Sequence, residues 1–320
     1  MLKYFSENKK KYFKKKNNFL TDGKNNYPII NSIPRFNKSI INYASMWGEQ
    51  WGHYQLTQFD SYTKTNLTRD RLEFILGAKV QVLKNKNILE VGSGAGRFTE
   101  VLLKAGANVH TIDASKAVDY NYKNNRNKSK KFKICQSDLY NIPYEDNKFD
   151  YVICIGVLQH TPDTLKSLKC LWKKVKLDGY LLVDHYEFTI GYYFGLLWLF
   201  RLFLKNIPNW LSIKICKFIV KLFFPILWPA RNYYYFFRIL RKIFPLGFNY
   251  HDRRSLSKKQ HYQWTELDTH DAMTDPYKRL LTKAKFNKML QNLNGKIDLL
   301  SSLRPGGNGL EARIKKIKKR

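Results

Sequence analysis

Three glycines at alternate positions mark the segment of this chain whose residue types best fit ligand binding. LEVGSGAG, from Leu89 to Gly96, places Gly92, Gly94 and Gly96 between an apolar run and a run with helical spacing. Because glycine has no side chain, the backbone N–H groups of such a turn can approach a ligand closely at the carboxyl end of a strand. The spacing therefore predicts a site for a compact polar ligand.

A dinucleotide is one ligand that glycine-rich loops bind. The dinucleotide motif G-x-G-x-x-G requires a glycine three positions after the second one. Here that position is Arg97, and the third glycine, Gly96, comes one residue too early. The spacing disfavours a dinucleotide.

The loop and three later motifs resemble class I S-adenosylmethionine-dependent methyltransferases, closest to the branch that acts on quinones and small molecules. The first motif, E-x-G-x-G-x-G, begins at Glu90, and the fourth, FDYVICIGVLQHTPD, runs from Phe149 to Asp163. Between them lie TIDAS, which contains Asp113, and QSDLYNIPY, which contains Asp138. The resemblance implies that Asp113 holds the ribose hydroxyls of the cofactor and that Asp138 contacts its adenine.

The cofactor implied by this resemblance is S-adenosylmethionine, with its amino-acid portion over the glycine loop. For Glu90 we expect mainly a role in positioning the loop backbone. Arg97 either pairs with the carboxylate of the cofactor or covers a helix face, and the sequence leaves both open. The implied cofactor site consists of Glu90, Gly92, Ser93, Gly94, Gly96, Arg97, Asp113, Ala114, Ser115, Asp138, Leu139 and Val157.

Methyl transfer to a hydroxyl requires alignment of the acceptor and removal of its proton. His160 follows the fourth strand of the core, where the resemblance places the methyl group, so it is a candidate base; the alternative is a packing residue of the cofactor pocket. His185, at the end of the fifth strand, is a second candidate. His270 and Asp271, in LDTHDAMTDPY, form either an acceptor wall or a capped, solvated turn.

No metal site is expected from the cysteines. Cys135, Cys154, Cys170 and Cys216 fall at unrelated spacings without a Cys-x-x-Cys pair. This pattern fits neither a zinc ribbon nor a disulfide scaffold, so we expect reduced packing residues.

Apolar runs and helical patterns alternate from residue 87 onward, which predicts a mostly parallel sheet covered by helices. We expect an α/β fold with a doubly wound, Rossmann-like sheet of seven strands, N-terminal helices and a helical aromatic insert. KIDLLSSL and GLEARIKK, joined by RPGGN, predict an antiparallel hairpin at the sheet edge. Strands are expected at 87–91, 108–113, 131–136, 149–158 and 180–186, and helices at 97–106 and 163–175 and within 68–82 and 115–127.

Composition divides the chain into four segments. Residues 1–44 are basic and expected to be a flexible leader, and 45–187 hold the N-terminal helices and the S-adenosylmethionine-binding core. Residues 188–250 form the aromatic and cationic insert. Residues 251–320 return to the core and end in the hairpin and a basic tail.

The insert has many aromatic residues and, from Phe188 to Phe248, no Asp or Glu. Its longest uncharged run is too short to span a bilayer, and Pro208, Pro225, Pro229 and Pro245 interrupt the remainder. Lys214, Lys217 and Lys221 share one helical face, with apolar residues on the other. The insert is either a lid over the acceptor pocket or a contact with an anionic membrane surface.

The net charge of +32 and pI of 9.9 invite comparison with nucleic-acid-binding proteins. Much of the excess lies in lysine blocks near both ends, which are usually solvated, so nucleic acid is not the expected substrate. The basic amino terminus lacks the apolar stretch of a secretion signal. We expect a cytoplasmic protein, peripheral at the inner membrane face if the insert contacts lipid.

These features together predict an S-adenosylmethionine-dependent methyltransferase, specifically an O-methyltransferase, of a small-molecule, glycan or lipid-linked acceptor. The alternatives are an RNA methyltransferase and a membrane-associated protein that keeps the fold without turnover. The sequence does not specify the oligomeric state.

Overall fold

The computed structural model describes residues 1–37, 42–190, 193, 195–250, 253–302 and 309–318. Its strands are β1 (Phe5–Ser6), β2 (Lys11–Tyr12), β3 (Lys14–Lys16), β4 (Phe19–Thr21), β5 (Asn26–Ile30), β6 (Ile33–Pro34), β7 (Asn87–Val91), β8 (Asn108–Asp113), β9 (Phe132–Gln136), β10 (Phe149–Cys154), β11 (Val175–Tyr186), β12 (Lys296–Ser301) and β13 (Gly309–Lys315). The α-helices are α1 (Asn42–His53), α2 (Asp60–Thr63), α3 (Leu67–Leu76), α4 (Arg97–Lys104), α5 (Ala117–Asn125), α6 (Thr164–Lys174), α7 (Leu196–Leu204), α8 (Asn209–Ala230), α9 (Tyr234–Ile243), α10 (Lys258–Thr274) and α11 (Lys283–Gln291). Short 3₁₀ helices occur at η1 (Val80–Leu83), η2 (Leu139–Asn141) and η3 (Leu158–His160).

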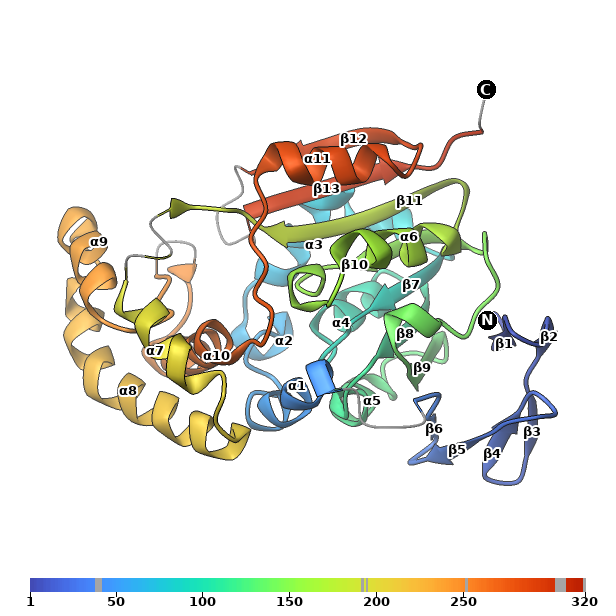
Figure 1. Cartoon of the computed structure of the whole chain (residues 1–320), viewed down its shortest axis with the longest axis horizontal. Coiled ribbons are helices and arrows are strands. Elements are labelled where there is room, and N and C mark those ends of the chain that lie inside the picture. The colour runs from blue at the N-terminus through green and yellow to red at the C-terminus, as the bar shows by residue number, and fades with distance from the viewer. Residues whose placement is uncertain (38–41, 191–192, 194, 251–252, 303–308, 319–320) are drawn as a thin grey trace.

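The central sheet has seven strands in the order β12-β13-β11-β10-β7-β8-β9 (Figure 1). The strands from β11 across to β9 pair in parallel, whereas β13 is antiparallel to both β11 and β12. The predicted α/β fold with a mostly parallel seven-stranded sheet and a closing hairpin is thus confirmed; the RPGGN turn lies outside the described residues. The chain order reverses between β7 and β10, where sheets of this kind bind ligands.

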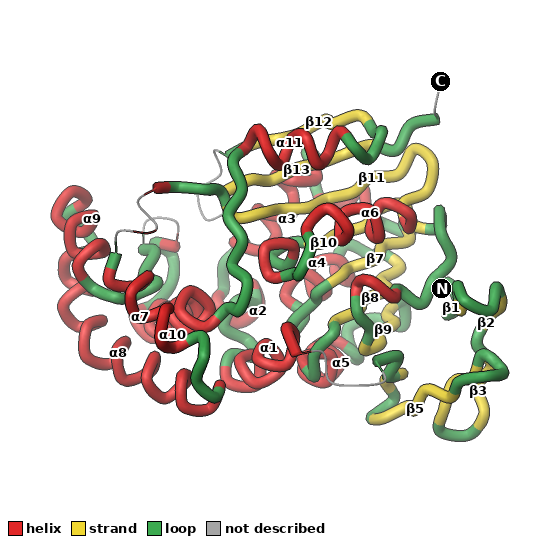
Figure 2. Tube along the Cα trace, viewed as in Figure 1, coloured by secondary structure: helices red, strands yellow, loops and turns green. Residues whose placement is uncertain are grey.

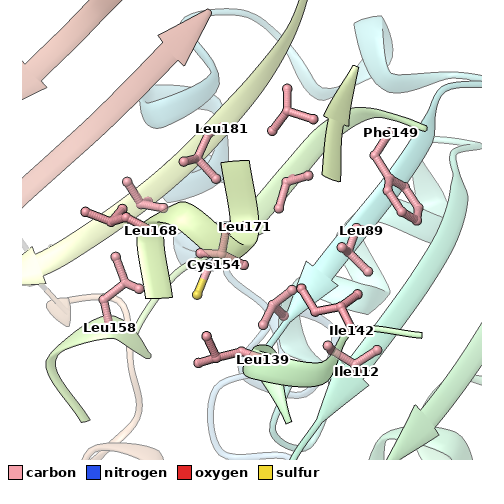
Figure 3. Close-up of a cluster of buried hydrophobic side chains, with 14 of the residues drawn as sticks. Leu89, Ile112, Leu139, Ile142, Phe149, Cys154, Leu158, Leu168, Leu171 and Leu181 are labelled. Carbon is pink, nitrogen blue, oxygen red and sulfur yellow. The ribbon is translucent and has the colours of Figure 1, made fainter. Parts of the chain in front are cut away.

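Side chains of each central strand alternate between two apolar layers, as expected for a strand buried on both faces. In β10, Val152 and Cys154 join one hydrophobic cluster, whereas Ile153 joins the other. The first cluster includes Leu168 and Leu171 of α6 (Figure 3), and the second includes residues of α3 and α4. Figure 2 shows these helices as red segments on either side of the yellow strands. The sheet is therefore held between helical layers, with its strand ends free to form a site.

The leader, expected to be flexible, is arranged differently in its described part, residues 1–37. It forms short antiparallel strands, and Ile33 and Phe36 are buried against the core. Arg35 makes a parallel bridge to Gln136 of β9, and the N–H of Phe36 donates to the Gln136 carbonyl at 2.8 Å. The leader covers the exposed edge of β9, because an uncovered edge strand leaves backbone groups unpaired.

The insert forms α7, α8 and α9, which lie with α10 on the opposite side of the molecule from β1–β6 (Figure 1). Its helices are confirmed, but Pro225 and Pro229 do not divide the segment as the sequence suggested: α8 continues through both. One face of α8 packs against α10 through residues such as Cys216 and Met273. Among the described residues, no helix combines the length and apolar character needed to cross a membrane.

Candidate functional site

A cavity of about 310 Å³ opens at the carboxyl ends of β7, β8, β9 and β10. Predicted residues line most of its core side: Gly92, Ser93, Gly94, Gly96, Arg97, Asp113, Ala114, Leu139, Val157, His160 and Asp271. Glu90, Ser115, Asp138, His185 and His270 do not line it. The volume falls in the range of small-molecule pockets.

The glycine loop is shaped by close packing. A Cβ at Gly92 would lie 2.3 Å from Cγ2 of Val157, and one at Gly94 would lie 2.8 Å from the Trp51 indole. Gly94 and Gly96 also have positive φ angles of 52° and 98°. Both the backbone conformation and the neighbours therefore exclude a side chain at this turn.

Glu90 lies beneath the loop, fully buried at the end of β7. Its Oε2 accepts a hydrogen bond from Oγ1 of Thr99 at 2.6 Å, whereas Oε1 has no partner among the described residues. Burial raises the pKa of Glu90 to about 7, although the Thr99 hydrogen bond opposes this shift. Ser93 Oγ is likewise buried without a described partner. Ser93 lines the cavity, so its hydroxyl can receive a ligand group, whereas Glu90 lies behind the loop.

Asp113 joins the loop to the end of β8. Its Oδ2 accepts from the N–H of Gly94 at 2.9 Å, and its Oδ1 accepts from the N–H and Oγ of Ser115 at 2.8 and 2.7 Å. Burial raises the pKa of Asp113, and these hydrogen bonds oppose that effect. A carboxylate offers about four lone-pair sites. About one site is left for a ligand hydroxyl, so Asp113 both shapes the loop and can bind.

Asp138 serves the turn after β9 rather than the cavity wall. Its side chain accepts from the N–H of Tyr140 at 3.2 Å, and the neighbouring Leu139 lines the cavity instead. The N–H of Asp138 donates to Oδ1 of Asn37 at 3.0 Å, and Nδ2 of Asn37 donates to the Ala114 carbonyl at 2.9 Å. Asn37, which the sequence did not single out, therefore ties together the turns after β8 and β9.

Arg97 is the first residue of α4, and its side chain lines the cavity. Its guanidinium lies 4.6 Å from the Phe98 ring centroid and forms no ion pair within the described part of the chain. Burial, helped by the charge of nearby Arg71, lowers the pKa of Arg97 to about 9. Such a cation is suited to a carboxylate ligand.

His160 lies in η3, after β10, and faces aromatic rings. The Trp47 ring lies 4.6 Å away and the Tyr186 ring 5.5 Å away, centroid to centroid. Its Nδ1 lies 2.6 Å from Oδ2 of Asp275. Burial lowers the pKa of His160, but the Asp275 carboxylate, helped by Asp271, raises it above the ordinary value overall.

The other two histidine candidates are buried outside the cavity. His185 packs on Phe286, and its Nδ1 donates to the Tyr186 carbonyl at 3.1 Å. His270 bonds Gln50 of α1 and lies 3.3 Å from Oγ of Ser212 in α8. Burial lowers the pKa of each to about 4. Both contact neighbouring elements rather than a ligand space.

Asp271 lies in LDTHDAMTDPY, for which the sequence left two interpretations: an acceptor wall or a capped, solvated turn. The segment is not a solvated turn through Thr274, because its first part belongs to the buried helix α10. Oδ2 of Asp271 accepts from the Tyr186 hydroxyl at 2.9 Å. His160, Asp271 and Asp275 bring nitrogen and oxygen atoms within 4.8 Å of one another. Nδ1 of His160 and Oδ2 of Asp275 already bond each other, and Oδ2 of Asp271 already bonds the Tyr186 hydroxyl. The expectation that the chain has no metal site remains a prediction.

The remaining cavity wall comes from residues that sequence analysis did not identify. Trp47 and Trp51 of α1 line the cavity, with Trp51 against Gly94, and α10 contributes Trp264 and Asp268. Arg253 lies 4.2 Å from the Trp264 ring centroid and pairs with Asp268 at 2.5 Å. The signals in the sequence were the tryptophans before the core and the acids after the insert. These two groups are more than 200 positions apart in the chain, so the sequence alone does not bring them to one site.

Residues 89–183 match the family described as a methyltransferase domain. By this match, residues 89–183 of the chain are similar to a methyltransferase domain. The ubiquinone biosynthesis O-methyltransferase of Hydrogenovibrio crunogenus is 30% identical over 147 residues, covering 43% of this chain and 54% of that protein. The protein of the same name from Actinobacillus pleuropneumoniae is 30% identical over 129 residues, covering 38% and 55%. The chain thus spans about half the length of the curated relatives it matches.

Among solved structures, a putative S-adenosylmethionine-dependent methyltransferase from Methanococcus maripaludis superposes with a TM-score of 0.48 at 14% identity. That superposition covers 89% of this chain and 99% of the other. The likeness is too loose to carry an argument, and the assignment of the domain rests on the sequence match and the sheet order.

The cofactor of a class I methyltransferase domain is S-adenosylmethionine, and the cavity fits this group. Ser93 Oγ is a buried polar atom without a described partner, in a cavity-lining loop that excludes side chains. Arg97 supplies a half-buried cation at the cavity wall and Asp113 a remaining acceptor site. These groups suit the ammonium, carboxylate and ribose hydroxyls of an amino-acid nucleoside.

Proposed function

We propose that this chain is an S-adenosylmethionine-dependent O-methyltransferase of a small molecule that carries a hydroxyl group. The observation that carries the proposal is the single cavity that brings together the glycine loop, Asp113 and His160. The match over residues 89–183 and the names of the curated relatives support it.

On the cofactor side, the loop from Gly92 to Gly96 lets a ligand approach the backbone, and Asp113 accepts a ribose hydroxyl. The N–H groups of Gly92, Ser93, Gly94 and Gly96 are already bonded within the chain, so they shape the loop instead of binding the cofactor. We assign Arg97 to the cofactor carboxylate, and Leu139, Ala114 and Ser137 to the wall around the adenine. Bound S-adenosylmethionine supplies a methyl group on a positively charged sulfur, so transfer forms an O–C bond, breaks a C–S bond with its electron pair going to sulfur, and releases the hydroxyl proton.

On the acceptor side, His160 is the group placed to take that proton. Trp47, Tyr186 and Trp264 provide aromatic surface around the same cavity. Such walls favour an acceptor with a flat or apolar body, and they exclude water from the reacting atoms.

Acceptors with phosphate backbones are not favoured. Asp271 lines the cavity beside His160, and its carboxylate would repel an RNA phosphate at the transfer site, whereas the carboxylate of Asp268 is paired with Arg253. A phenol-like ring or a glycan hydroxyl meets no such repulsion.

We further propose that the acceptor is lipid-linked and that the insert rests on an anionic membrane surface. The face of α8 that points away from α10 exposes Trp210, Phe218, Leu222 and Ile226 beside Lys214 and Lys221. In α9, Tyr235 is 78% exposed. Exposed aromatic residues among cations, without acids, are typical of interfacial helices.

This arrangement differs from the expected one, in which lysines and apolar residues occupied opposite faces. The buried face of α8 is apolar because it forms a core with α10, and lysines share the exposed face with large apolar residues. Of the described residues of the insert, Asn249 alone lines the cavity, while α8 and α9 face outward and α10, which follows the insert, forms the cavity wall. These observations support the membrane contact more than the lid. We keep the four segments 1–44, 45–187, 188–250 and 251–320 as a proposed division.

The experiment that tests the proposed function is transfer of a radiolabelled methyl group from S-adenosylmethionine to catechol-type acceptors and to a bacterial lipid extract. We expect labelled product in the organic phase, and the label should resist alkali because it is held in an ether. The His160→Gln variant should form no such product. Label that instead follows RNA and disappears with ribonuclease would favour the RNA methyltransferase. Cofactor binding without any labelled product would favour a protein that keeps the fold without turnover.

A further inference from the structure

The segment from Asp275 to Leu281, named the strap here, connects α10 to α11 and lies across the loop that carries His160. The N–H of Arg279 donates to the Gln159 carbonyl at 3.0 Å, and its Nε donates to the Thr161 carbonyl at 3.1 Å. A further Arg279 nitrogen donates to the Pro162 carbonyl. The strap therefore fixes the backbone on both sides of His160.

The far end of the strap is anchored to the sheet. The N–H of Leu281 donates to the Tyr186 carbonyl at 3.0 Å, and its carbonyl accepts from the N–H of Phe188 at 2.9 Å. This attachment continues the edge of β11 and gives the strap a fixed position relative to the cavity.

Asp275 begins the strap and is fully buried, and its Oδ2 bonds Nδ1 of His160 at 2.6 Å. Its Oδ1 accepts from the N–H of Tyr277 at 3.0 Å, which holds the carboxylate in place. Because a carboxylate only accepts, Nδ1 of His160 carries the proton. Nε2, which lies 3.2 Å from the Gln159 side-chain nitrogen, is then the basic atom of the neutral ring.

We propose that the strap is the positioning element of the transfer site, in which Asp275 fixes the tautomer of His160 and Arg279 fixes its loop. The proposal rests on the proposed function. In the reaction, the proton leaves the acceptor oxygen for Nε2 of His160 while Nδ1 keeps its own, and the resulting imidazolium lies against the Asp275 carboxylate. The proton then passes to solvent.

The charges that face His160 come from several elements. Asp271 of α10 adds to the effect of Asp275 in raising the pKa of the ring, and Lys278 of the strap opposes them. Asp184 and His185 of β11 also act on it through their charges. Removal of the Asp275 charge leaves burial as the largest influence, so the pKa of His160 falls.

The test is NMR titration of the histidine ring nitrogens in the ¹⁵N-labelled full chain without cofactor, with His160→Gln used to assign the signal. We expect a His160 midpoint above 6.5 and a protonated Nδ1 in the neutral ring. Asp275→Asn, which keeps the shape, lowers the midpoint, and Asp298→Asn, an exposed carboxylate of β12, does not.

Turnover gives the second readout. We expect Asp275→Asn to lower kcat about 100-fold, the size of a general-base contribution, and to move the rise of the pH profile to lower pH. Arg279→Lys keeps the charge but loses the forked donor, so it lowers kcat with little change in the midpoint. Binding of S-adenosylmethionine stays within about twofold in both variants.

An unchanged His160 midpoint and an unchanged kcat in folded Asp275→Asn would overturn the proposal. Failure of the proposed function is distinguishable, because the titration needs neither cofactor nor acceptor. A wild-type chain that shows the expected titration but binds no S-adenosylmethionine contradicts the proposed function and leaves the strap geometry in place.

Discussion

A buried cluster of charged residues connects the elements that surround the cavity. Arg71 of α3 pairs with Asp184 of β11 and with Glu311 of β13, and all three are buried. Oδ1 of Asp184 accepts from the N–H of Gly156 at 2.6 Å, beside the cavity. The cluster therefore connects the helix layer, the sheet and the loop after β10.

Replacement of Arg71 by Met leaves two buried carboxylates without their cation. We expect Arg71→Met to lower the free energy of unfolding by about 3–5 kcal/mol. The matched control is Arg69→Met on the same helix, whose side chain is 43% exposed and which should change stability by less than about 0.5 kcal/mol. Urea denaturation measures both, and equal midpoints for the two variants would contradict this account of the cluster.

The sequence predicted those site residues that lie in local motifs at the strand ends. The glycine loop, Asp113 and His160 lie at strand ends within a short stretch, and all line the cavity. Asp275, Trp264 and Asn37 reach the same region from more than 70 positions away, through side-chain contacts that no periodicity records. For the adenine contact the sequence singled out Asp138, whereas its neighbour Leu139, also among the predicted residues, lines the cavity.

At the scale of elements, strand and helix patterns predicted the core well because its strands are buried on both faces and its helices on one. The leader was missed because its strands have only 2 to 5 residues and gain order by docking against β9. The extent of α8 was missed because Pro225 and Pro229 normally end a helix, whereas here packing against α10 retains it.

The docked leader should contribute to cofactor binding through Asn37. Asn37→Ala removes the hydrogen bonds that join the turns after β8 and β9, so we expect the Kd for S-adenosylmethionine to rise about fivefold to tenfold, the equivalent of about one hydrogen bond. Asn18→Ala, at an exposed position of the leader, should leave the Kd unchanged. Identical titration curves for the two variants would show that the leader does not act on the site.

The insert is tied to the first helix by His270, which bonds Gln50 and Ser212. Burial holds the pKa of His270 at about 4, below the value of about 6.5 in the unfolded chain. The unfolded state therefore binds the additional proton first, and stability from this residue is present above pH 6.5 and lost as the pH falls toward 4.

His270→Asn removes that titration. Compared with this variant, the wild type should lose up to about 1.4 kcal/mol more per pH unit between pH 6.5 and 4. Urea midpoints at several pH values in that window measure the difference. Parallel curves for wild type and variant would mean that the pKa of His270 is the same in the folded and the unfolded chain.

At the scale of the whole molecule, the net charge of +32 and the exposed aromatic insert act in the same direction. Lysines attract the chain to an anionic surface, and apolar side chains then enter its headgroup region. The two effects can be separated because salt weakens only the first.

We expect the chain to sediment with phosphatidylglycerol vesicles and not with phosphatidylcholine vesicles. Phe218→Ser with Leu222→Ser should weaken binding at least about tenfold, because each lost side chain contributes about 1.5–3 kcal/mol of burial. The matched control is Phe74→Ser with Leu177→Ser, exposed residues of the core. Equal sedimentation of both double variants would contradict a membrane role for α8.

The most direct measurement is calorimetric titration of S-adenosylmethionine into the wild-type chain, Asp113→Asn and the exposed control Asp298→Asn. We expect saturable binding at one site, weakened at least about tenfold by Asp113→Asn, since its amide can accept only part of what the carboxylate accepts. The control should bind as the wild type does. No heat of binding in a folded wild-type chain, or equal affinities for wild type and Asp113→Asn, would contradict the central claim that this cavity is the cofactor site.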